Sequence, residues 1–530
     1  MRIAQNTLLL YIRMLFTMGV SLYTSRIVLQ VLGVNDFGIY NVVGGVVGMF
    51  GMLSNSLSSA IGRFITFELG KGNTDRLRSI FSTAINIQVL LAFGILCLGE
   101  IVGLWFLNTR MNINADRLDA ATWVLHASLL TFVVNLIGTP YNAMMIAYEH
   151  MKAFAYISIL EALLKLGVVF LLQVATYDKL VVYAGLLLGM AVLIQIIYGI
   201  YCKRTFAAAA YQWGIDKQLL REMLGFTGWN FIGSSSSVLK DQGVNIVINL
   251  FCGTAVNAAR GIAIQVNAAI GAFVGNFMTA LNPQITKSYA AGDYDFMLKL
   301  VQQGARLSFY LLLVLSLPVI ILAEGILSLW LNTVPEHTVL FVRLILILAM
   351  CDALSGTLTT AMQSTGRIRN YQLTVGGLQM LNFPISYLLI KMDLFPESTV
   401  MVAIGISLAC LFARLLFLRV MVRLSVRGFL KHVVRNALIV STVSMVAPLL
   451  CYTQLTPGLG RFFVVSGVSL LSTLAVIYCL GCNWQERTFI RAKAALLLDK
   501  LRNIRYRFKQ NPNVVAVLLA HPSAQAKPLK

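Results

Sequence analysis

Acidic side chains are scarce in this sequence, whose 530 residues include 21 Asp and Glu against 42 Lys and Arg. Charge of either sign is also scarce: charged residues make up 12% of the chain, hydrophobic residues make up 58%, and the mean hydropathy is +0.78. Soluble globular domains carry about 25% charged residues, so this composition excludes an ordinary soluble domain. The sequence therefore predicts an integral membrane protein.

Motifs that carry enzyme chemistry are missing as well. The sequence has no phosphate-binding glycine loop followed by Lys and Ser or Thr, no nucleophile elbow and no paired metal ligands. Its five histidines are far apart, and its eight cysteines are scattered through apolar runs without the pattern of a zinc site or a disulfide framework. We expect no enzyme activity, no metal site and no cofactor.

Apolar stretches long enough to cross about 30 Å of hydrocarbon run through the chain. Fourteen such stretches lie at about 8–32, 39–62, 80–107, 121–147, 153–175, 180–202, 229–251, 256–282, 300–331, 338–362, 371–391, 398–422, 436–455 and 461–483. Thirty of the 42 basic residues fall in the even-numbered loops and the two chain ends, against six in the odd-numbered loops. By the positive-inside rule, this bias predicts that both termini are cytoplasmic.

The second half of the chain repeats the first at a shift of 220 residues. Gly33 corresponds to Gly253, and the turn at Gly72-Asn73 corresponds to Gly292-Asp293. Repeated halves are typical of transporters whose two lobes rock about a central substrate site. We predict an all-α membrane protein of about 14 transmembrane helices, with two six-helix lobes related by a pseudo-two-fold repeat and two extra C-terminal helices. The expected parts are an N-terminal lobe (1–202), a cytoplasmic linker (203–228), a C-terminal lobe (229–422), a basic loop with two peripheral helices (423–483) and a basic cytoplasmic tail (484–530).

The tail contains a segment, 487–509, that places Lys and Arg beside apolar residues at helical spacing. This pattern predicts an amphipathic helix on the anionic inner leaflet of the membrane. Nucleic-acid binding would need a folded module with stacking aromatic side chains, and the sequence shows none.

Ionisable side chains inside the first lobe are candidates for a binding cavity, because such groups at membrane depth usually face water or a partner. Arg26 shares a helical turn with Thr24 and Ser25, and it either faces the cavity or extends to the headgroups. Glu161 and Lys165 are four residues apart in the favourable order. They either neutralise each other within the bundle or exchange partners when an anion meets Lys165.

The stretch 229–251 is the least hydrophobic of the fourteen and contains four consecutive serines. A helix this polar can hardly face lipid. We expect three of its side chains and one from the next span to line the cavity: Ser235, Lys240, Asn245 and Arg260. Asp352 is the one solitary acid well inside the bundle, so it is the candidate residue for coupling transport to a cation or a proton.

Three stretches resemble the oligosaccharide-unit flippases of bacterial surface-polysaccharide synthesis, within the multidrug/oligosaccharidyl-lipid/polysaccharide exporter superfamily. They read SRIVLQVLGVNDFGIYNVV, RFITFELGKGNTDRLRSIFSTA and TPYNAMMIAYEHMKAFAYISILEALLKL, and the likeness extends to about residue 483. The resemblance implies transfer of an undecaprenyl-pyrophosphate-linked oligosaccharide, for O-antigen, capsule or exopolysaccharide, to the outer leaflet of the cytoplasmic membrane. It also implies alternating access through a cationic cavity. The related lipid II flippases have working arginines in their first and eighth helices, and Arg26 and Arg260 lie at comparable places.

Two other functions stay open. A MATE-type multidrug exporter coupled to a cation shares the superfamily, but cation export favours a carboxylate in the cavity and the first span has none. A non-transporting membrane scaffold is the third interpretation. For the flippase, the partners are a lipid-linked oligosaccharide and anionic inner-leaflet lipid, with polysaccharide polymerase machinery as a further candidate.

Overall fold

The structure is a computed structural model that describes residues 2–48, 50–109, 115–212, 216–331, 334–456, 458–484, 486–488 and 491. Apart from a few residues, the expected amphipathic segment 487–509 and the rest of the basic tail lie outside this described part. The described chain is almost entirely helical and contains no strand.

The first half of the chain forms six long helices. They are α1 (Arg2–Gly48), α2 (Gly51–Lys71), α3 (Thr74–Thr109), α4 (Leu118–Ala147), α5 (Met151–Val174) and α6 (Lys179–Thr205), with the short turns η1 (Ala115–Arg117) before α4 and η2 (Ala207–Ala209) after α6. Asp178 accepts hydrogen bonds from the backbone N–H groups of Leu180 and Val181, so it caps the N-terminus of α6.

The second half begins with α7 (Lys217–Ala290), the longest helix described. Three broken passes follow it, formed by α8 (Tyr294–Ile321) with α9 (Ala323–Trp330), α10 (Thr338–Ala353) with α11 (Gly356–Thr365), and α12 (Arg369–Met380) with α13 (Asn382–Lys391), and then the continuous α14 (Ser398–Val422). The last two passes are α15 (Val426–Phe429), η3 (Leu430–Val434) and α16 (Arg435–Gln454), and then α17 (Leu459–Val476) with η4 (Ile477–Gly481). Both η3 and η4 are π-helical turns.

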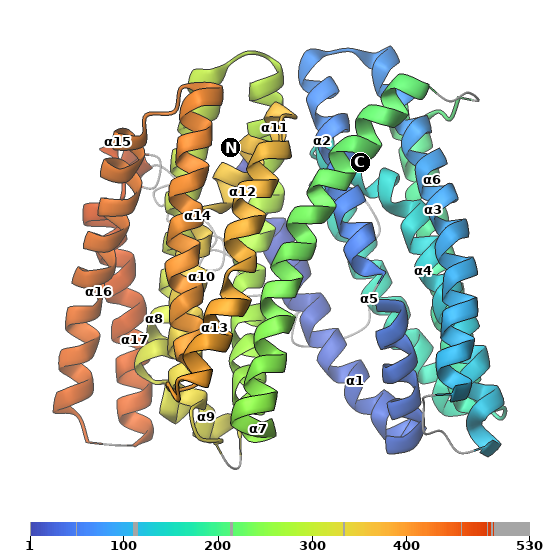
Figure 1. Cartoon of the computed structure of the whole chain (residues 1–530), viewed down its shortest axis with the longest axis horizontal. Coiled ribbons are helices and arrows are strands. Elements are labelled where there is room, and N and C mark those ends of the chain that lie inside the picture. The colour runs from blue at the N-terminus through green and yellow to red at the C-terminus, as the bar shows by residue number, and fades with distance from the viewer. Residues whose placement is uncertain are drawn as a thin grey trace, which may run out of the picture.

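Twelve helical spans in the described part are long and apolar enough to cross a membrane. This confirms the all-α membrane fold. Two of the fourteen expected spans, 39–62 and 229–251, are not among the twelve. The first is divided between α1 and α2, and the second is the polar stretch inside α7. Figure 1 shows that α7 nevertheless runs the height of the bundle.

The sequence repeat appears in the backbone at four glycines. Gly33 (φ 75°, ψ 171°) kinks α1, and Gly253 (φ 86°, ψ 175°) kinks α7 in the same way. This region of backbone space is essentially open only to glycine. Gly72 and Gly292 then end the next helical segment of each half in the left-handed conformation, with φ of 73° and 79°. Each half therefore starts with the same helical hairpin.

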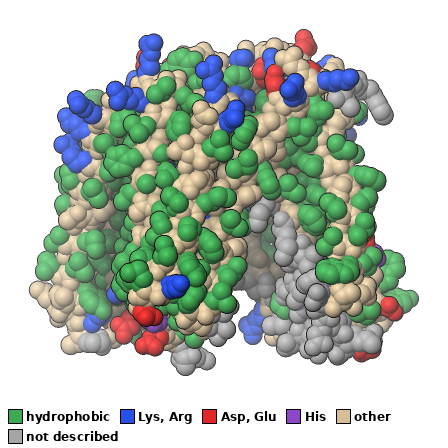
Figure 2. Space-filling model, in the orientation of Figure 1, with side chains coloured by type: hydrophobic (Ala, Val, Ile, Leu, Met, Phe, Trp, Pro, Cys, Tyr) green, Lys and Arg blue, Asp and Glu red, His purple; other side chains and the backbone are tan. Residues whose placement is uncertain are grey.

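The helices form two groups, with α1–α6 in one and α8–α14 in the other, while α16 and α17 lie beyond the second group (Figure 1). Lys and Arg side chains gather at one end of the bundle, where the turns after α2 and α7 lie, and we call it the basic end (Figure 2). At the opposite end Figure 2 shows a hollow between the two groups, and we call it the hollow end.

One buried apolar cluster joins the two halves. It includes Leu57 and Ile61 of α2, Leu281 and Ile285 of α7, and Leu358 of α11. Many large apolar side chains are also exposed on the outside of the bundle, as contact with lipid requires. The halves are therefore packed together through α2 and α7 and separate away from that contact.

Candidate functional site

Three cavities contain the polar and charged side chains of interest. A central cavity of about 360 Å³ lies between α2 and α4 of the first half and α7 and α11 of the second. A first-half cavity of about 440 Å³ is lined by α1, α4, α5 and α6. A second-half cavity of about 330 Å³ is lined by α7, α10, α13 and α14.

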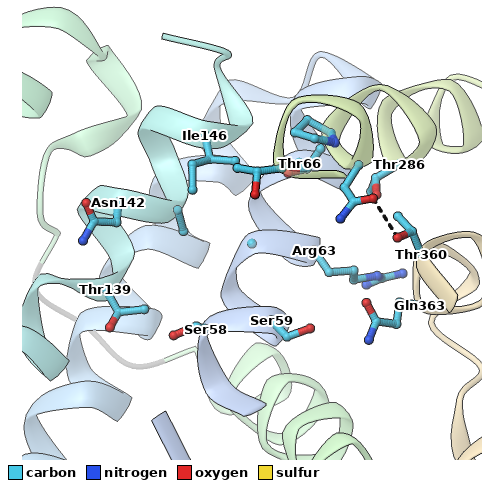
Figure 3. Close-up of a pocket in the computed structure, with 15 residues that line it drawn as sticks. Ser58, Ser59, Arg63, Thr66, Thr139, Asn142, Ile146, Thr286, Thr360 and Gln363 are labelled. Atoms are coloured by element: carbon cyan, nitrogen blue, oxygen red, sulfur yellow. Dashed lines mark hydrogen bonds between the residues drawn. The ribbon is translucent and has the colours of Figure 1, made fainter. Parts of the chain in front are cut away.

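Hydroxyl and amide side chains dominate the central cavity (Figure 3). They are Ser58, Ser59, Thr66, Thr139, Asn142, Thr279, Asn282, Thr286, Thr360 and Gln363. The Thr360 hydroxyl donates to Asn282 Oδ1 at 2.9 Å, the bond dashed in Figure 3, and so links α11 to α7. The cavity can therefore offer both donors and acceptors to a polyhydroxylated ligand.

Among the described residues that line the central cavity, Arg63 is the single charged one. Its guanidinium lies over the rings of Phe67, Phe64 and Phe226, with distances to the ring centroids of 4.5, 4.8 and 5.6 Å. Arg63 Nη2 donates to the Ser364 carbonyl of α11 at 3.2 Å. An anion entering the cavity would meet this guanidinium (Figure 3).

The apolar stretch 39–62 predicts that the second span ends before Arg63, which would place Arg63 in the following loop. In the structure α2 continues to Lys71, so Arg63 lies within the helix. A signal was present: Ser58, Ser59, Arg63 and Thr66 recur at helical spacing and mark one polar face.

The first-half cavity brings Glu161 and Lys165 together with Arg13. Lys165 Nζ lies 3.2 Å from Glu161 Oε1 on one face of α5. Arg13 donates through Nη2 to Asn276 Oδ1 of α7 at 2.9 Å and through Nη1 to Ser158 Oγ at 3.4 Å. Its contact with Asn276 links this cavity to the second half of the protein.

The second-half cavity brings together four of the residues expected from the sequence, Lys240, Asn245, Arg260 and Asp352. Arg260 is 6% exposed and donates through Nη1 to Asn245 Oδ1. The Ser407 hydroxyl donates to Asp352 Oδ1 at 2.5 Å. This cluster lies inside the second half, whereas the central cavity lies between the halves.

Arg26 and Ser235 line none of these three cavities. Arg26 is exposed and Ser235 is half-buried. Their roles stay predictions. Among the described residues, no three His, Cys, Asp or Glu side chains gather as a metal site would require. The side chains that line the three cavities supply hydrogen-bonding and charged groups.

The basic end is closed by contacts between the halves. Glu149, in the turn after α4, accepts through Oε1 from Lys287 Nζ at 2.5 Å and from Gln284 Nε2 at 2.7 Å. These Glu149 bonds join the halves on the side of the central cavity where the basic residues lie. Asn230 Nδ2 of α7 donates to the Ser56 carbonyl of α2 at 3.2 Å. This second contact lies deeper in the bundle, because Ser56 is farther from Gly72 than the α2 residues that line the cavity.

The chain is similar to known proteins both in sequence and in fold. A family model described as "Polysaccharide biosynthesis protein" matches residues 3–291, and the MatE model matches residues 241–388. The uncharacterized membrane protein EpsK of Bacillus subtilis (strain 168) is 20% identical over 323 residues, which cover 60% of this chain and 63% of EpsK.

Two solved structures share the fold. A multidrug resistance MATE family transporter of the MOP superfamily, in an outward-facing conformation, matches with a TM-score of 0.69 and 12% identity over 79% of this chain and 95% of that one. The MATE transporter ClbM in complex with Rb⁺ matches with a TM-score of 0.65 and 19% identity over 81% and 96% of the two chains. At these identities the likeness establishes the fold alone.

Proposed function

This chain belongs to the polysaccharide biosynthesis protein family, and from that premise we propose that it flips undecaprenyl-pyrophosphate-linked oligosaccharide units across the bacterial cytoplasmic membrane. Its family and its fold make it a multi-pass membrane transporter of the MOP type rather than an enzyme. The substrate, the membrane and the direction of transport are what we propose here.

The main support for this proposal is the set of side chains that line the central cavity. Ten of its lining side chains are hydroxyls or amides, which suit the hydroxyl groups of sugars. Arg63, the one charged side chain in the part of the lining that the structure describes, can bind a phosphate oxygen pair through its planar fork. None of these described lining residues is Asp or Glu, whereas an exporter of organic cations would favour a carboxylate there.

An alternating-access cycle would set the direction in which the head group is transported. The basic end is cytoplasmic by the positive-inside rule, so the closed basic end and the open hollow end correspond to an outward-facing state. A head group would enter through the basic end when the halves part there, and would leave through the hollow end. The lipid tail can stay in the bilayer while the head group crosses. Anionic inner-leaflet lipid at the basic end and polysaccharide polymerase machinery remain proposed partners.

The charged cavity inside each half contains candidate residues for binding the substrate and for coupling transport to an ion gradient. We retain Lys165, Lys240 and Arg260 as further contacts for anionic parts of the substrate, and Asp352 as the coupling residue. Asp352→Asn is expected to abolish gradient-stimulated flipping while binding persists, because the variant cannot take up a proton or a cation. If the variant still responds to an imposed gradient, the membrane potential acting on the substrate's own charge drives the cycle instead.

A cation-coupled multidrug exporter is the second candidate function. Asp241 and Asp352 in the second-half cavity favour it, because carboxylates bind organic and inorganic cations. The MatE match over residues 241–388 covers the region that contains both acids.

A transport assay on purified protein in liposomes separates the candidates. Liposomes carry the undecaprenyl-pyrophosphate-linked oligosaccharide, and an external lectin reports the units that reach the outer leaflet. The same liposomes, loaded with ethidium and given a sodium or proton gradient, report drug export. We expect head-group transfer and no ethidium export. Ethidium export without transfer would replace the proposal by the exporter, and neither activity would indicate a scaffold.

A matched pair of variants links the transfer to the cavity. Gln363 lines the central cavity, whereas Gln173 is exposed near the end of α5 and lines none of the three cavities. Gln363→Leu is expected to reduce transfer several-fold, because it removes a donor and an acceptor for sugar, while Gln173→Leu leaves transfer unchanged. Equal activity of the two variants would move the sugar site elsewhere.

A further inference from the structure

The Arg63 guanidinium is shared between the two halves of the protein. Arg63 belongs to α2, whereas its carbonyl acceptor, Ser364, belongs to α11 and its aromatic neighbour Phe226 belongs to α7. This contact lies where the central cavity meets the closed basic end. The same side chain therefore lines the cavity and joins the two halves.

The guanidinium keeps donors available in this position. An arginine has five N–H donors, and one hydrogen bond from the Arg63 side chain occurs within the described residues. Its Nε atom is buried without a partner there. Gly366 makes room for the group, since a methyl on its Cα would meet Arg63 Nη2 at 2.7 Å. The group is thus held in a slot by ring faces and one neutral carbonyl.

We propose that Arg63 is a switch that couples anion binding to the gate at the basic end. In the closed state it bonds to Ser364, and when the halves part there it is free to bind a phosphate or pyrophosphate group in the central cavity. The inference rests on the proposed function, because the anion is the head group of the lipid that the protein carries.

In this proposal the Ser364 carbonyl and a phosphate group compete for the Arg63 guanidinium, and the outcome favours transport in one direction. A phosphate is a charged acceptor that pairs with both arms of the guanidinium, so it is a stronger partner than the Ser364 carbonyl. The anion therefore binds more tightly when the basic end is open, and by linkage it favours that opening. Closing the basic end returns Arg63 to Ser364 and weakens the hold on the head group. The head group is thus bound from the basic end and released at the hollow end.

The test measures the distance between the halves at the basic end. Asp75 and Asp295 are exposed, occupy equivalent places in the repeat, and lie one in each half. Both are replaced by cysteine in a chain without its eight native cysteines and carry spin labels. Distance distributions are recorded without ligand, with inorganic pyrophosphate and with farnesyl pyrophosphate. The two probes show whether the prenyl chain is needed in addition to the anion.

We expect pyrophosphate or its farnesyl ester to raise the long-distance fraction of the otherwise unaltered chain several-fold. Arg63→Gln should raise this fraction without ligand and should lose the response to both probes, and Arg63→Lys should keep part of it. Lys287→Gln is the matched control: it breaks the ion pair with Glu149 across the same end but does not touch the cavity. It should rest more open and keep the full response.

Three results would overturn the switch. They are an unaltered chain that responds to neither probe, an Arg63→Gln variant that responds as fully as the parent, and a Lys287→Gln variant that loses the response along with Arg63→Gln. Failure of the oligosaccharide transfer assay is separable from these outcomes. A transporter of another phosphate-bearing lipid would fail that assay and would still show the Arg63-dependent change in distance.

Discussion

At the basic end, polar bonds run from one half of the protein to the other, whereas at the hollow end those among the described residues stay within a half. The bonds across the basic end include Glu149 with Lys287 and Arg63 with the Ser364 carbonyl. At the hollow end, Arg117 pairs with Asp36 and Asp178 in the first half, and His337 pairs with Glu397 at 2.7 Å in the second.

This difference indicates which contacts a conformational change must break. Parting the halves at the basic end breaks bonds between them, so their free energy sets the balance between the two states. The bonds at the hollow end lie within each half, so we expect them to persist through the proposed cycle. Changes at the basic end should therefore alter transport, and changes at the hollow end should alter stability.

The largest effect is expected at Arg63. Arg63→Gln removes both the gate contact and the anion ligand, so surface polysaccharide should fall at least about ten-fold, a loss of roughly 1.4 kcal/mol or more. Arg63→Lys keeps the charge but loses the planar fork, and should restore part of the activity. The measurement is polysaccharide on cells whose own unit flippase is deleted. Arg419, which is exposed and lines none of the three cavities, supplies the control Arg419→Gln. Full activity of Arg63→Gln would show that transport does not depend on the Arg63 contact at the basic end.

The kink glycines at the hollow end are expected to affect stability. Gly253→Ala forces an alanine into a backbone conformation essentially limited to glycine, and should destabilise the fold by about 1–3 kcal/mol. Gly271→Ala, in the same helix, is the control, because an added methyl there meets nothing within 4 Å and its φ is not positive. Thermal unfolding in detergent compares the two variants. Equal melting temperatures would show that the kink is not fixed by Gly253.

Two acidic residues at the basic end allow a partly buried ion pair to be compared with an exposed one. The Glu149 side chain is 9% exposed and its pair with Lys287 is short, whereas the Glu222 side chain is 41% exposed and lies 3.6 Å from Arg76. Glu149→Gln should shift the closed state toward opening by about 1.5 kcal/mol, and Glu222→Gln should have a much smaller effect. A cysteine at Thr66, inside the central cavity, reports opening through its labelling from the basic side. Equal labelling rates in the two variants would mean that this ion pair does not hold the gate.

The smallest effect is expected from pH at the hollow end. Burial alone would raise the pKa of Asp178, but hydrogen bonds from Arg117 and from the backbone of α6 lower it below its ordinary value. A carboxylate whose pKa is lowered by folding stabilises the protein above its unfolded pKa, and this contribution is lost as pH falls through the folded value. Acid unfolding should therefore begin at slightly higher pH in Arg117→Gln, and transport at neutral pH should not change. A shift in the gate's distance distribution in this variant would contradict the division between the two ends.

Sequence reasoning reached the membrane fold and the repeat because both depend on local pattern. Hydropathy marks a span, and Gly33 and Gly253 stand out because their neighbours repeat at one fixed shift. The sequence also predicts that Ser235, Lys240, Asn245 and Arg260 line a cavity, and it names Asp352 separately as the coupling candidate. In the structure, Lys240, Asn245, Arg260 and Asp352 line one cavity inside the second half. That they lie inside a half rather than between halves depends on how α7 packs against α10, α13 and α14.

Arg63 could not be found in the same way. Hydropathy ends its span at residue 62, but a helix ends where its backbone turns, and Gly72 makes that turn ten residues later. The partners that give Arg63 its place, Phe226 and Ser364, are 163 and 301 residues away along the chain. Contacts at such separations follow from tertiary packing, which local pattern does not encode.

The four repeat glycines also fix a length. Gly72 is 39 positions after Gly33, and Gly292 is 39 positions after Gly253. Each half thus carries an arm of equal residue count between a kink and a turn, and the tips of both arms lie at the basic end. Inserting or deleting one residue in a single arm would rotate its tip by about 100° relative to its counterpart, since a helix turns once every 3.6 residues. The two arms must therefore change length together.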